Sequence, residues 1–287
     1  MNRLLATALA ILAVPASAQT QYGCTGVVGS WSAALGCLRG ASPANDLADQ
    51  VFYTKGSYGA YAAPFATYSA PYNTMVRGTD YLDTMSVDPA LFPAASQITW
   101  KWPGTAPTGA VGVWGNMALT FGDYDSTVQQ LAIPARKVDA IAVLTSSFRW
   151  TYAASSGDGF DLLHEFYLTA APGTASGGKL FEIGFFLHTP PTTVTFTGYN
   201  TQLGTCSENG RTWTVARSAN STPFVTLVPA GNVDLLSGTI DVRAVLLCLK
   251  GKGVITGQEY FNGMDFGVEP LFGSGSVGVY SWSVTYS

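Results

Sequence analysis

The chain has 287 residues, of which 47% are hydrophobic and 11% are charged, and its formal net charge at pH 7 is -4. An average soluble protein has roughly 25% charged residues, so the surface of this protein must be rich in uncharged polar groups. With 14 Lys and Arg and no basic run, the composition argues against nucleic acid or an anionic membrane as a partner and favours a neutral polar ligand.

The N-terminal residues have the organisation of a secretory signal peptide. Arg3 precedes an apolar run from Leu4 to Val14, and Ala16-Ser17-Ala18 follows as a cleavage site. The run is too short to span a bilayer, and no later stretch approaches the ~20 apolar residues that a membrane helix needs. We therefore predict a signal peptide over 1–18, a secreted mature chain and no membrane attachment. An ordinary buried N-terminal helix is the alternative.

The cysteines of an exported chain are expected to form disulfides. Cys24, Cys37, Cys206 and Cys248 allow three connectivities, and we favour Cys24–Cys37 with Cys206–Cys248 because each closes a local loop. None lies in a CxxC pair, and both histidines are far along the chain from every cysteine, so no metal site is expected. Residues 19–65, rich in Ala, Gly and Tyr, are predicted to form an N-terminal extension packed on the main domain.

From about residue 66, short β-rich runs bounded by Gly, Pro, Asn and Asp follow one another. In chain order, the expected strands are 97–102, 109–122, 139–152, 161–170, 179–189, 193–199, 211–217, 223–228 and 277–286. This pattern is typical of a sandwich or jelly roll of antiparallel strands. We predict a single all-β domain over 66–287, built from two antiparallel sheets.

The segment 232–253 departs from this pattern. Its second half carries apolar residues that would suit a helix ending at Gly251 and packed on the outside of a sheet. Two strands are the alternative for the same residues. We expect one short helix in the domain.

The run FEIGFFLH (181–188) contains a carboxylate within an otherwise apolar sequence. Successive side chains of a strand point to opposite faces, so the odd-numbered residues form an apolar face for the core. The even-numbered residues share the other face: Glu182, Gly184, Phe186 and His188. We interpret this second face as the floor of a cleft for a polar, ring-shaped ligand. For His188, the alternative is a residue that simply ends the strand.

Two further acidic residues belong to the same interpretation. In the run 161–169, Glu165 and Tyr167 share a face, and Glu165 could lie beside Glu182 if the two strands are neighbours. Carboxyls that close repel each other, and one pKa should rise. Glu269 precedes Pro270 shortly before the last strand. The alternative to a site residue at this position is a glutamate that is simply solvated. Two glutamates on facing strands could serve as acid and nucleophile for glycoside cleavage, about 5–5.5 Å apart in a retaining enzyme.

Paired tryptophans form another feature of the expected sheets. Trp100 and Trp102 share one face of the strand at 97–102, with Lys101 on the opposite face. Such a pair is either part of the core or a platform on which sugars stack.

Taken in order, several motifs resemble those of glycoside hydrolase family 12. The matching segments are WKWPG with VGVWGN, IPARKVDAI with SSFRWTY, HEFYLTAAPGTASGGKLFEIGFFL, and FGVEPLFGSGSVGVYSWSV. Together they cover about 66–287. The resemblance implies a concanavalin-like β-jelly roll with a concave substrate cleft, and a retaining endo-β-1,4-glucanase or xyloglucanase that needs no cofactor.

The resemblance also implies roles for the acidic residues. Glu182 would be the nucleophile that forms a glycosyl-enzyme, and Glu269 would be the general acid and then the base. Glu165 would take the place of the family's Asp beside the nucleophile. The positions that we expect to contact substrate are Asn73, Trp100, Trp102, Trp114, Asn116, Tyr167, Phe186 and His188.

The sequence departs from the family at positions that stack on sugars. The tryptophan of the family's Asn-Leu-Trp-Gly is missing, and Gly184, Phe186 and Leu271 replace larger groups. Each lost aromatic contact costs roughly 0.5–1.5 kcal/mol. We expect a secreted, monomeric retaining endo-glycosidase that binds β-1,4-glucan or xyloglucan, or a variant that takes another β-glycan. A non-catalytic glycan-binding module on the same fold is the alternative.

Overall fold

The computed structural model describes residues 37–39, 53–68, 70–76, 78–108, 112–125, 133–154, 159–174, 178–198 and 200–287. The predicted signal peptide and Cys24 lie outside the described residues, and so does the predicted Cys24–Cys37 bridge. None of the helices in these ranges is both long and apolar enough to cross a membrane.

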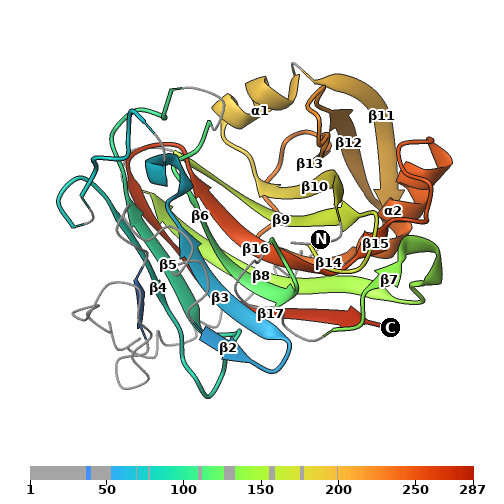
Figure 1. Cartoon of the computed structure of the whole chain (residues 1–287), viewed down its shortest axis with the longest axis horizontal. Helices are drawn as coiled ribbons and strands as arrows, with labels where there is room; N and C mark the ends of the chain where they lie inside the picture. The colour runs from blue at the N-terminus through green and yellow to red at the C-terminus, as the bar shows by residue number, and fades with distance from the viewer. Residues whose placement is uncertain are drawn as a thin grey trace, which may run out of the picture.

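Two sheets form the body of the protein (Figure 1). In the described part of the chain, the smaller sheet has six strands in the order β1 (Cys37–Arg39), β4 (Leu82–Ser86), β5 (Ser96–Lys101), β17 (Ser274–Tyr286), β8 (Leu144–Ala154) and β14 (Ser237–Asp241). The path of the larger sheet runs β11 (Thr201–Glu208), β12 (Arg211–Arg217), β13 (Phe224–Pro229), β10 (Lys179–His188), β9 (Phe160–Thr169), β16 (Gly263–Pro270), β6 (Asn116–Gly122), β3 (Tyr58–Ala63) and β2 (Tyr53–Lys55). The short strand β15 (Tyr260–Phe261) joins this sheet between β9 and β7 (Arg136–Lys137). The predicted all-β fold with two sheets is confirmed.

The pairing is antiparallel between the described strands except at β10 and β13, which run parallel. Parallel neighbours need a long connection, and here the chain passes through a helix, β11 and β12 before it returns to the edge of β10. The expectation of purely antiparallel sheets therefore fails at this one described pair. The consequence for the site is that Phe224 of β13 lies beside Glu182 of β10.

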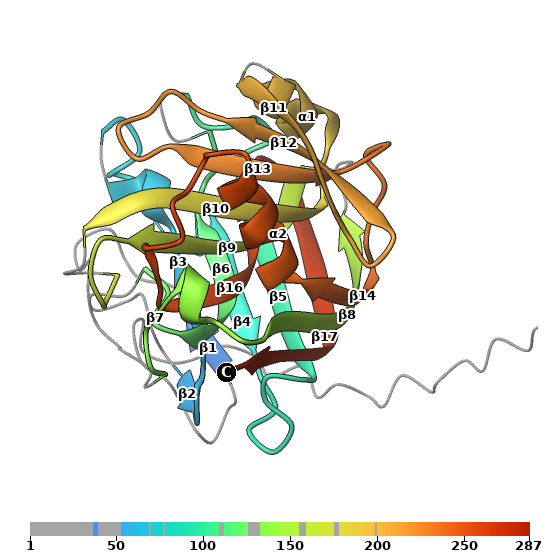
Figure 2. The same ribbon diagram turned by 90° about the vertical axis from the view of Figure 1, so that its right-hand side faces the viewer.

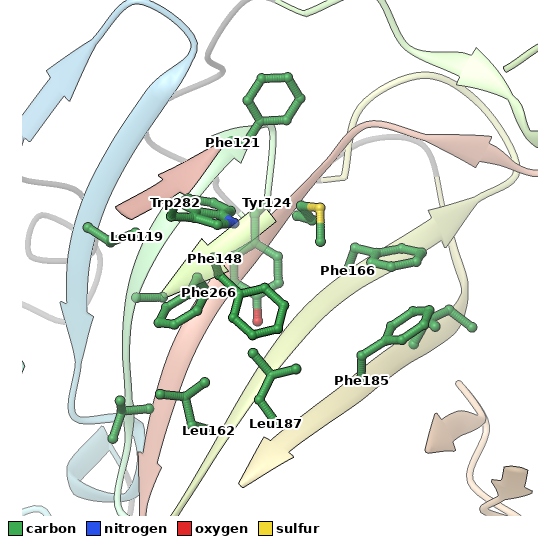
Figure 3. Packing of buried hydrophobic residues seen from close by; sticks show 14 of the residues in the cluster. Leu119, Phe121, Tyr124, Phe148, Leu162, Phe166, Phe185, Leu187, Phe266 and Trp282 are labelled. Atoms are coloured by element: carbon green, nitrogen blue, oxygen red, sulfur yellow. The ribbon is translucent and has the colours of Figure 1, made fainter. Parts of the chain in front are cut away.

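The core lies between the two sheets and is rich in aromatic rings. Phe166 of β9 and Phe185 of β10 lie side by side on the larger sheet, with ring centroids 6.3 Å apart (Figure 3). Phe266 of β16 packs against Phe148 and Trp282 from the smaller sheet, at 6.3 and 5.9 Å. The inward face of β9, β10 and β16 is therefore occupied by apolar packing, which leaves their other face for polar residues.

The strands β2 and β3 come from the region predicted as an N-terminal extension. β3 pairs with β6 from Tyr58 to Ala63, and β2 pairs with β3. The last residues of the predicted extension are therefore hydrogen-bonded into the larger sheet. The domain boundary at residue 65 stays a prediction, and it falls immediately after a strand of this sheet.

Two α-helices are present in the described residues where one was expected. The predicted helix is α2 (Val242–Gly251), which begins after Asp241, whose side chain accepts a hydrogen bond from the Ala244 amide at 2.9 Å. It packs beside β11 and β8 (Figure 2). The other helix, α1 (Pro191–Gly198), replaces the strand predicted over 193–199.

The strand prediction at α1 was wrong because β-branched residues dominate the segment. Thr and Val favour strands, but Pro191 presets the backbone angle of a first helical residue. The hydroxyl of Thr195 donates to the Pro191 carbonyl at 2.9 Å, and that of Thr197 donates to the Val194 carbonyl at 3.0 Å. Threonine side chains that bond to the preceding turn are compatible with a helix, although they add little stability to it.

A disulfide joins β11 to α2. Cys206 and Cys248 are bridged with their Cα atoms 5.9 Å apart, across 42 positions of sequence, which confirms this half of the predicted pairing. We expect Cys206→Ser combined with Cys248→Ser to lower the free energy of unfolding by about 2–4 kcal/mol, because the unfolded chain regains the entropy of an open loop. Urea unfolding of both proteins measures this difference. An unchanged midpoint would show that the bridge adds no stability.

Candidate active site

Three adjacent strands of the larger sheet bring acidic side chains together. Strand β9 lies between β10 and β16. Its residue Glu165 pairs with Gly184 of β10, and its residue Asp161 pairs with Glu269 of β16. Glu182 pairs with Tyr167, two residues beyond Glu165. We call the following five residues the carboxyl cluster: Asp161, Glu165, Glu182, Asp265 and Glu269.

The predicted division of β10 into two faces is confirmed as far as Leu187. Ile183, Phe185 and Leu187 belong to the main core, whereas Phe186 packs in a separate apolar cluster with Leu163. This smaller cluster lies on the same side of the sheet as Glu182. Alternation of side chains along a strand is a local property, so it could be derived from the sequence.

His188 is the exception, and its predicted place beside Glu182 is wrong. The register shifts between Phe186 and His188, so that His188 pairs with the core residue Leu162. A β-bulge of this kind turns the next side chain to the opposite face. His188 consequently lies against the rings of Phe160, at 4.4 Å, and Tyr152, at 4.9 Å, and its Nδ1 is 2.8 Å from an oxygen of Asp234.

Glu165 and Glu182 form the first carboxyl pair of the cluster. Their side chains hydrogen-bond to each other, and burial together with the charge of Glu182 raises the pKa of Glu165 well above its usual range. The Tyr124 hydroxyl donates to Glu165 Oε2 at 3.0 Å. The Tyr167 hydroxyl donates to Glu182 Oε1 at 3.2 Å. A raised pKa favours the protonated form of Glu165, which can donate a hydrogen bond to the partly exposed Glu182.

Asp265 supports this pair from β16, and sequence reasoning did not find it. Its carboxylate accepts from the Glu165 amide at 2.6 Å and from Asn116 Nδ2 at 3.1 Å, and Asn116 also donates to the Tyr61 hydroxyl at 2.8 Å. The signal was present, since Asp265 and Glu269 are four positions apart on one strand and therefore share a face. Asn116, expected to touch substrate, is 3% exposed and holds this network together.

Asp161 and Glu269 form the second carboxyl pair. Burial, then the charges of Asp161 and Glu182, raise the pKa of Glu269 well above its usual range. Burial also raises the pKa of Asp161 to about 7, although the Thr193 hydroxyl donates to its Oδ2 at 2.9 Å. Asp161 was not among the predicted site residues, because only the tertiary pairing of β9 with β16 brings it to Glu269.

The tryptophans expected to bind sugar are buried. Trp100, Trp102 and Trp114 are 1%, 4% and 2% exposed, and Trp102 is stacked between Trp114, at 5.2 Å, and Tyr81, at 4.3 Å. This arrangement fits the core alternative for the pair in the strand at 97–102. Asn73, by contrast, lies exposed in a turn.

The space above Gly184 is occupied by an aromatic ring from the neighbouring strand. A Cβ atom added at Gly184 would lie 2.7 Å from the ring of Phe224 and 3.2 Å from Leu163. Phe224 also packs against Phe186, with ring centroids 6.1 Å apart. The ring of Phe224 thus takes up space beside Glu182 that a larger side chain at 184 would need.

We expect Gly184→Met to destabilise the protein by about 1–3 kcal/mol, because the added side chain overpacks this contact. Adding Phe224→Ala should recover part of the loss, as a double-mutant cycle in urea would measure. Gly198→Met is the matched control, since a Cβ there meets nothing within 4 Å. Equal effects at both glycines would contradict the steric explanation.

The sequence profile of glycosyl hydrolase family 12 matches residues 78–287, which include the whole carboxyl cluster. The chain belongs to glycosyl hydrolase family 12. It is therefore a glycoside hydrolase, as the motifs predicted. A search of curated protein sequences finds no significant match.

Solved structures of the family share the fold at low sequence identity. Endoglucanase 3 of Trichoderma harzianum is 19% identical with a TM-score of 0.62, over 83% of this chain and 94% of that chain. A xyloglucanase of Bacillus licheniformis is 15% identical with a TM-score of 0.63, over 83% and 97% of the two chains. The xyloglucanase domain of NopAA from Sinorhizobium fredii, in complex with cellobiose, is 16% identical with a TM-score of 0.55, over 82% and 95%. These likenesses confirm the jelly-roll fold of the family 12 domain.

Proposed function

We propose that this family 12 protein is a secreted, monomeric retaining endo-glycosidase that hydrolyses β-1,4-glucan or xyloglucan. Glu182 acts as nucleophile and Glu269 as acid and base. The observation that carries the proposal is the contrast between the two glutamates. Both are partly exposed and both are hydrogen-bonded to a second carboxyl, but Glu269 itself has a pKa well above its usual range, whereas in the other pair the neighbour Glu165 has the raised pKa and Glu182 accepts a hydrogen bond from Tyr167. An acid and a nucleophile need these different environments.

In the first step, an oxygen of Glu182 attacks the anomeric carbon of the sugar and the bond to the leaving oxygen breaks. Glu269 gives its proton to that oxygen, so the departing chain leaves as an alcohol. In the second step, Glu269, now ionised, takes a proton from water. The water oxygen attacks the anomeric carbon, and the bond to Glu182 breaks. The sugar keeps its original configuration because it is inverted twice.

Glu165 serves this cycle through its hydrogen bond to Glu182. A protonated Glu165 orients the attacking oxygen and stabilises the carboxylate that is released in the second step. Its own position is held by Tyr124 and by the amide contact to Asp265. Glu165 therefore takes over the part that the family's Asp plays beside the nucleophile, in spite of its extra methylene group.

A neutral glucan suits the remaining surface of the site. The low content of charged residues favours an uncharged polymer, and Phe224, partly exposed beside Glu182, offers an apolar ring to a sugar face. Structural relatives are described as an endoglucanase and as xyloglucanases. These two substrate classes are therefore the candidates.

Mass analysis of the products from mixed-linkage β-glucan, carboxymethylcellulose and xyloglucan tests the proposal. Internal cleavage should yield short oligosaccharides from at least one of the three, and the initial products should keep the β configuration when followed by proton NMR. Inverted products would refute the retaining mechanism. Binding to a glucan without release of any oligosaccharide would instead support the non-catalytic module.

A further inference from the structure

We propose that Asp161 is a positioning residue for Glu269, which it orients and whose working pH range as a proton donor it sets. The inference rests on the proposed function of Glu269 as acid and base. It assigns a role to a residue whose contacts lie between β9, β16 and α1, away from the pair formed by Glu165 and Glu182.

The contacts of Asp161 support Glu269 as the carboxyl that donates. Asp161 is 2% exposed, and its Oδ2 accepts the Thr193 hydroxyl at 2.9 Å. Its Oδ1 has no N–H or hydroxyl partner among the described residues, and Glu269 is the side chain that hydrogen-bonds to Asp161 from the paired strand. Two carboxyls can share a hydrogen bond only if one is protonated. The Thr193 hydroxyl stabilises the ionised form of Asp161, and the bond between the two carboxyls lowers the pKa of Asp161 and raises that of Glu269, so Glu269 is the better candidate for the partner that holds the proton and donates it to Asp161.

The helix α1 makes this arrangement possible. Thr193 lies in its first turn, shortly after β10 ends at His188. The turn that starts the helix is closed by the Val194 amide, which donates to the Pro190 carbonyl at 3.1 Å. The helix therefore supplies a hydroxyl that stabilises the ionised, accepting form of Asp161.

The negative charges around Glu269 show how Asp161 affects the pH at which Glu269 loses its proton. Acidic groups face Glu269 from three strands: Asp161 and Glu165 of β9, Glu182 of β10, and Asp265 of β16 itself. Among them, Asp161 makes the largest charge contribution to the raised pKa of Glu269. Loss of the Glu269 proton would place two negative charges in contact, so Glu269 remains an acid to higher pH. Without the charge on Asp161, Glu269 would lose its proton at lower pH.

The test is the pH dependence of kcat/KM on the preferred glucan for Asp161→Asn. We expect its alkaline limb to move to lower pH by about one unit or more, because a like charge has been removed from the acid. Asp139→Asn, the same chemical change at an exposed ion pair with Lys250, should keep the wild-type profile. An alkaline limb at the wild-type pH in Asp161→Asn, even with lower activity throughout, would overturn the inference.

A second pair of variants keeps both carboxyls in place. Thr193→Val should lower the plateau of kcat, since Asp161 then competes with Glu269 for the shared proton, and Thr193→Ser should restore it. Equal activity of all three proteins would count against the arrangement. If Asp161→Asn fails to fold, the two Thr193 variants test the role of Asp161 in its place.

A titration without substrate separates this inference from the proposed function. Carbon-13 NMR of the glutamate side-chain carboxyls, assigned with Glu269→Gln, should show Glu269 titrating at lower pH in Asp161→Asn than in the wild type. If this shift occurs but the wild type cleaves no glycan, the proposed function fails and the coupling stands. If the wild type is active and Glu269 titrates identically in both proteins, only the role of Asp161 fails.

Discussion

Glu182→Gln is expected to lower kcat/KM on the preferred glucan by on the order of 10⁴-fold or more, since the variant cannot form the covalent intermediate. The amide keeps the size of the carboxyl and its position beside Tyr167, so the fold should persist. Because Glu182 contributes to the repulsion that raises the pKa of Glu165, the variant should also let Glu165 ionise more readily. Initial rates and the thermal melting temperature measure the first two effects.

A covalent trap gives the sharpest test of the nucleophile. A 2-deoxy-2-fluoro glucoside with a good leaving group slows the second step, so the glycosyl-enzyme of the wild type should accumulate. Mass analysis should then find the added sugar on the peptide that contains 181–188. Asp139→Asn serves as the control and should label like the wild type. Label on another residue, or full activity of Glu182→Gln, would refute the role of Glu182.

Glu269→Gln is expected to lower kcat/KM on glucan by about 10²–10⁴-fold, the contribution typical of a general acid or base. The loss should be much smaller for an aryl glycoside whose leaving group needs little protonation, because the first step then proceeds without the acid. The second step still lacks its base, so the glycosyl-enzyme should accumulate in this variant. Rates on the two kinds of substrate, with mass analysis of the intermediate, measure the effect.

The same loss on both substrates would contradict the assignment of Glu269 as the acid. It would indicate that the variant disturbs binding or the fold instead of proton transfer. The alkaline limb provides a second criterion. In the wild type, activity should fall at high pH as Glu269 loses its proton, and this fall should be absent from the first step in Glu269→Gln.

Local patterns determined the class of the fold and the faces of its main strands. The alternation in 181–187 correctly separated Glu182 and Phe186 from the core residues, and the order of the motifs led to the family. The half of 232–253 that forms α2 was also identified, since the helix has a side-chain cap and a regular apolar face. Such features depend only on residues that are close together in the sequence, so they can be predicted from it.

Long-range pairing decided the rest of the candidate site. Asp161 meets Glu269, and Asp265 meets Glu165, only because β9 and β16 are adjacent in a particular register. The bulge that turns His188 into the core adds one residue to β10 relative to β9. We identified no sequence pattern that predicts this bulge. The segment Pro191–Gly198 forms helix α1 although its threonines favour a strand.

The sequence by itself therefore determined which residues can carry the chemistry, because residue type and periodicity are local. Tertiary structure decided which of them are partners. Hydrogen bonds and charge interactions between carboxyls act over a few ångströms in space, and the residues they join here are separated by as many as 108 positions, between Asp161 and Glu269. Strand register alone brings such residues together.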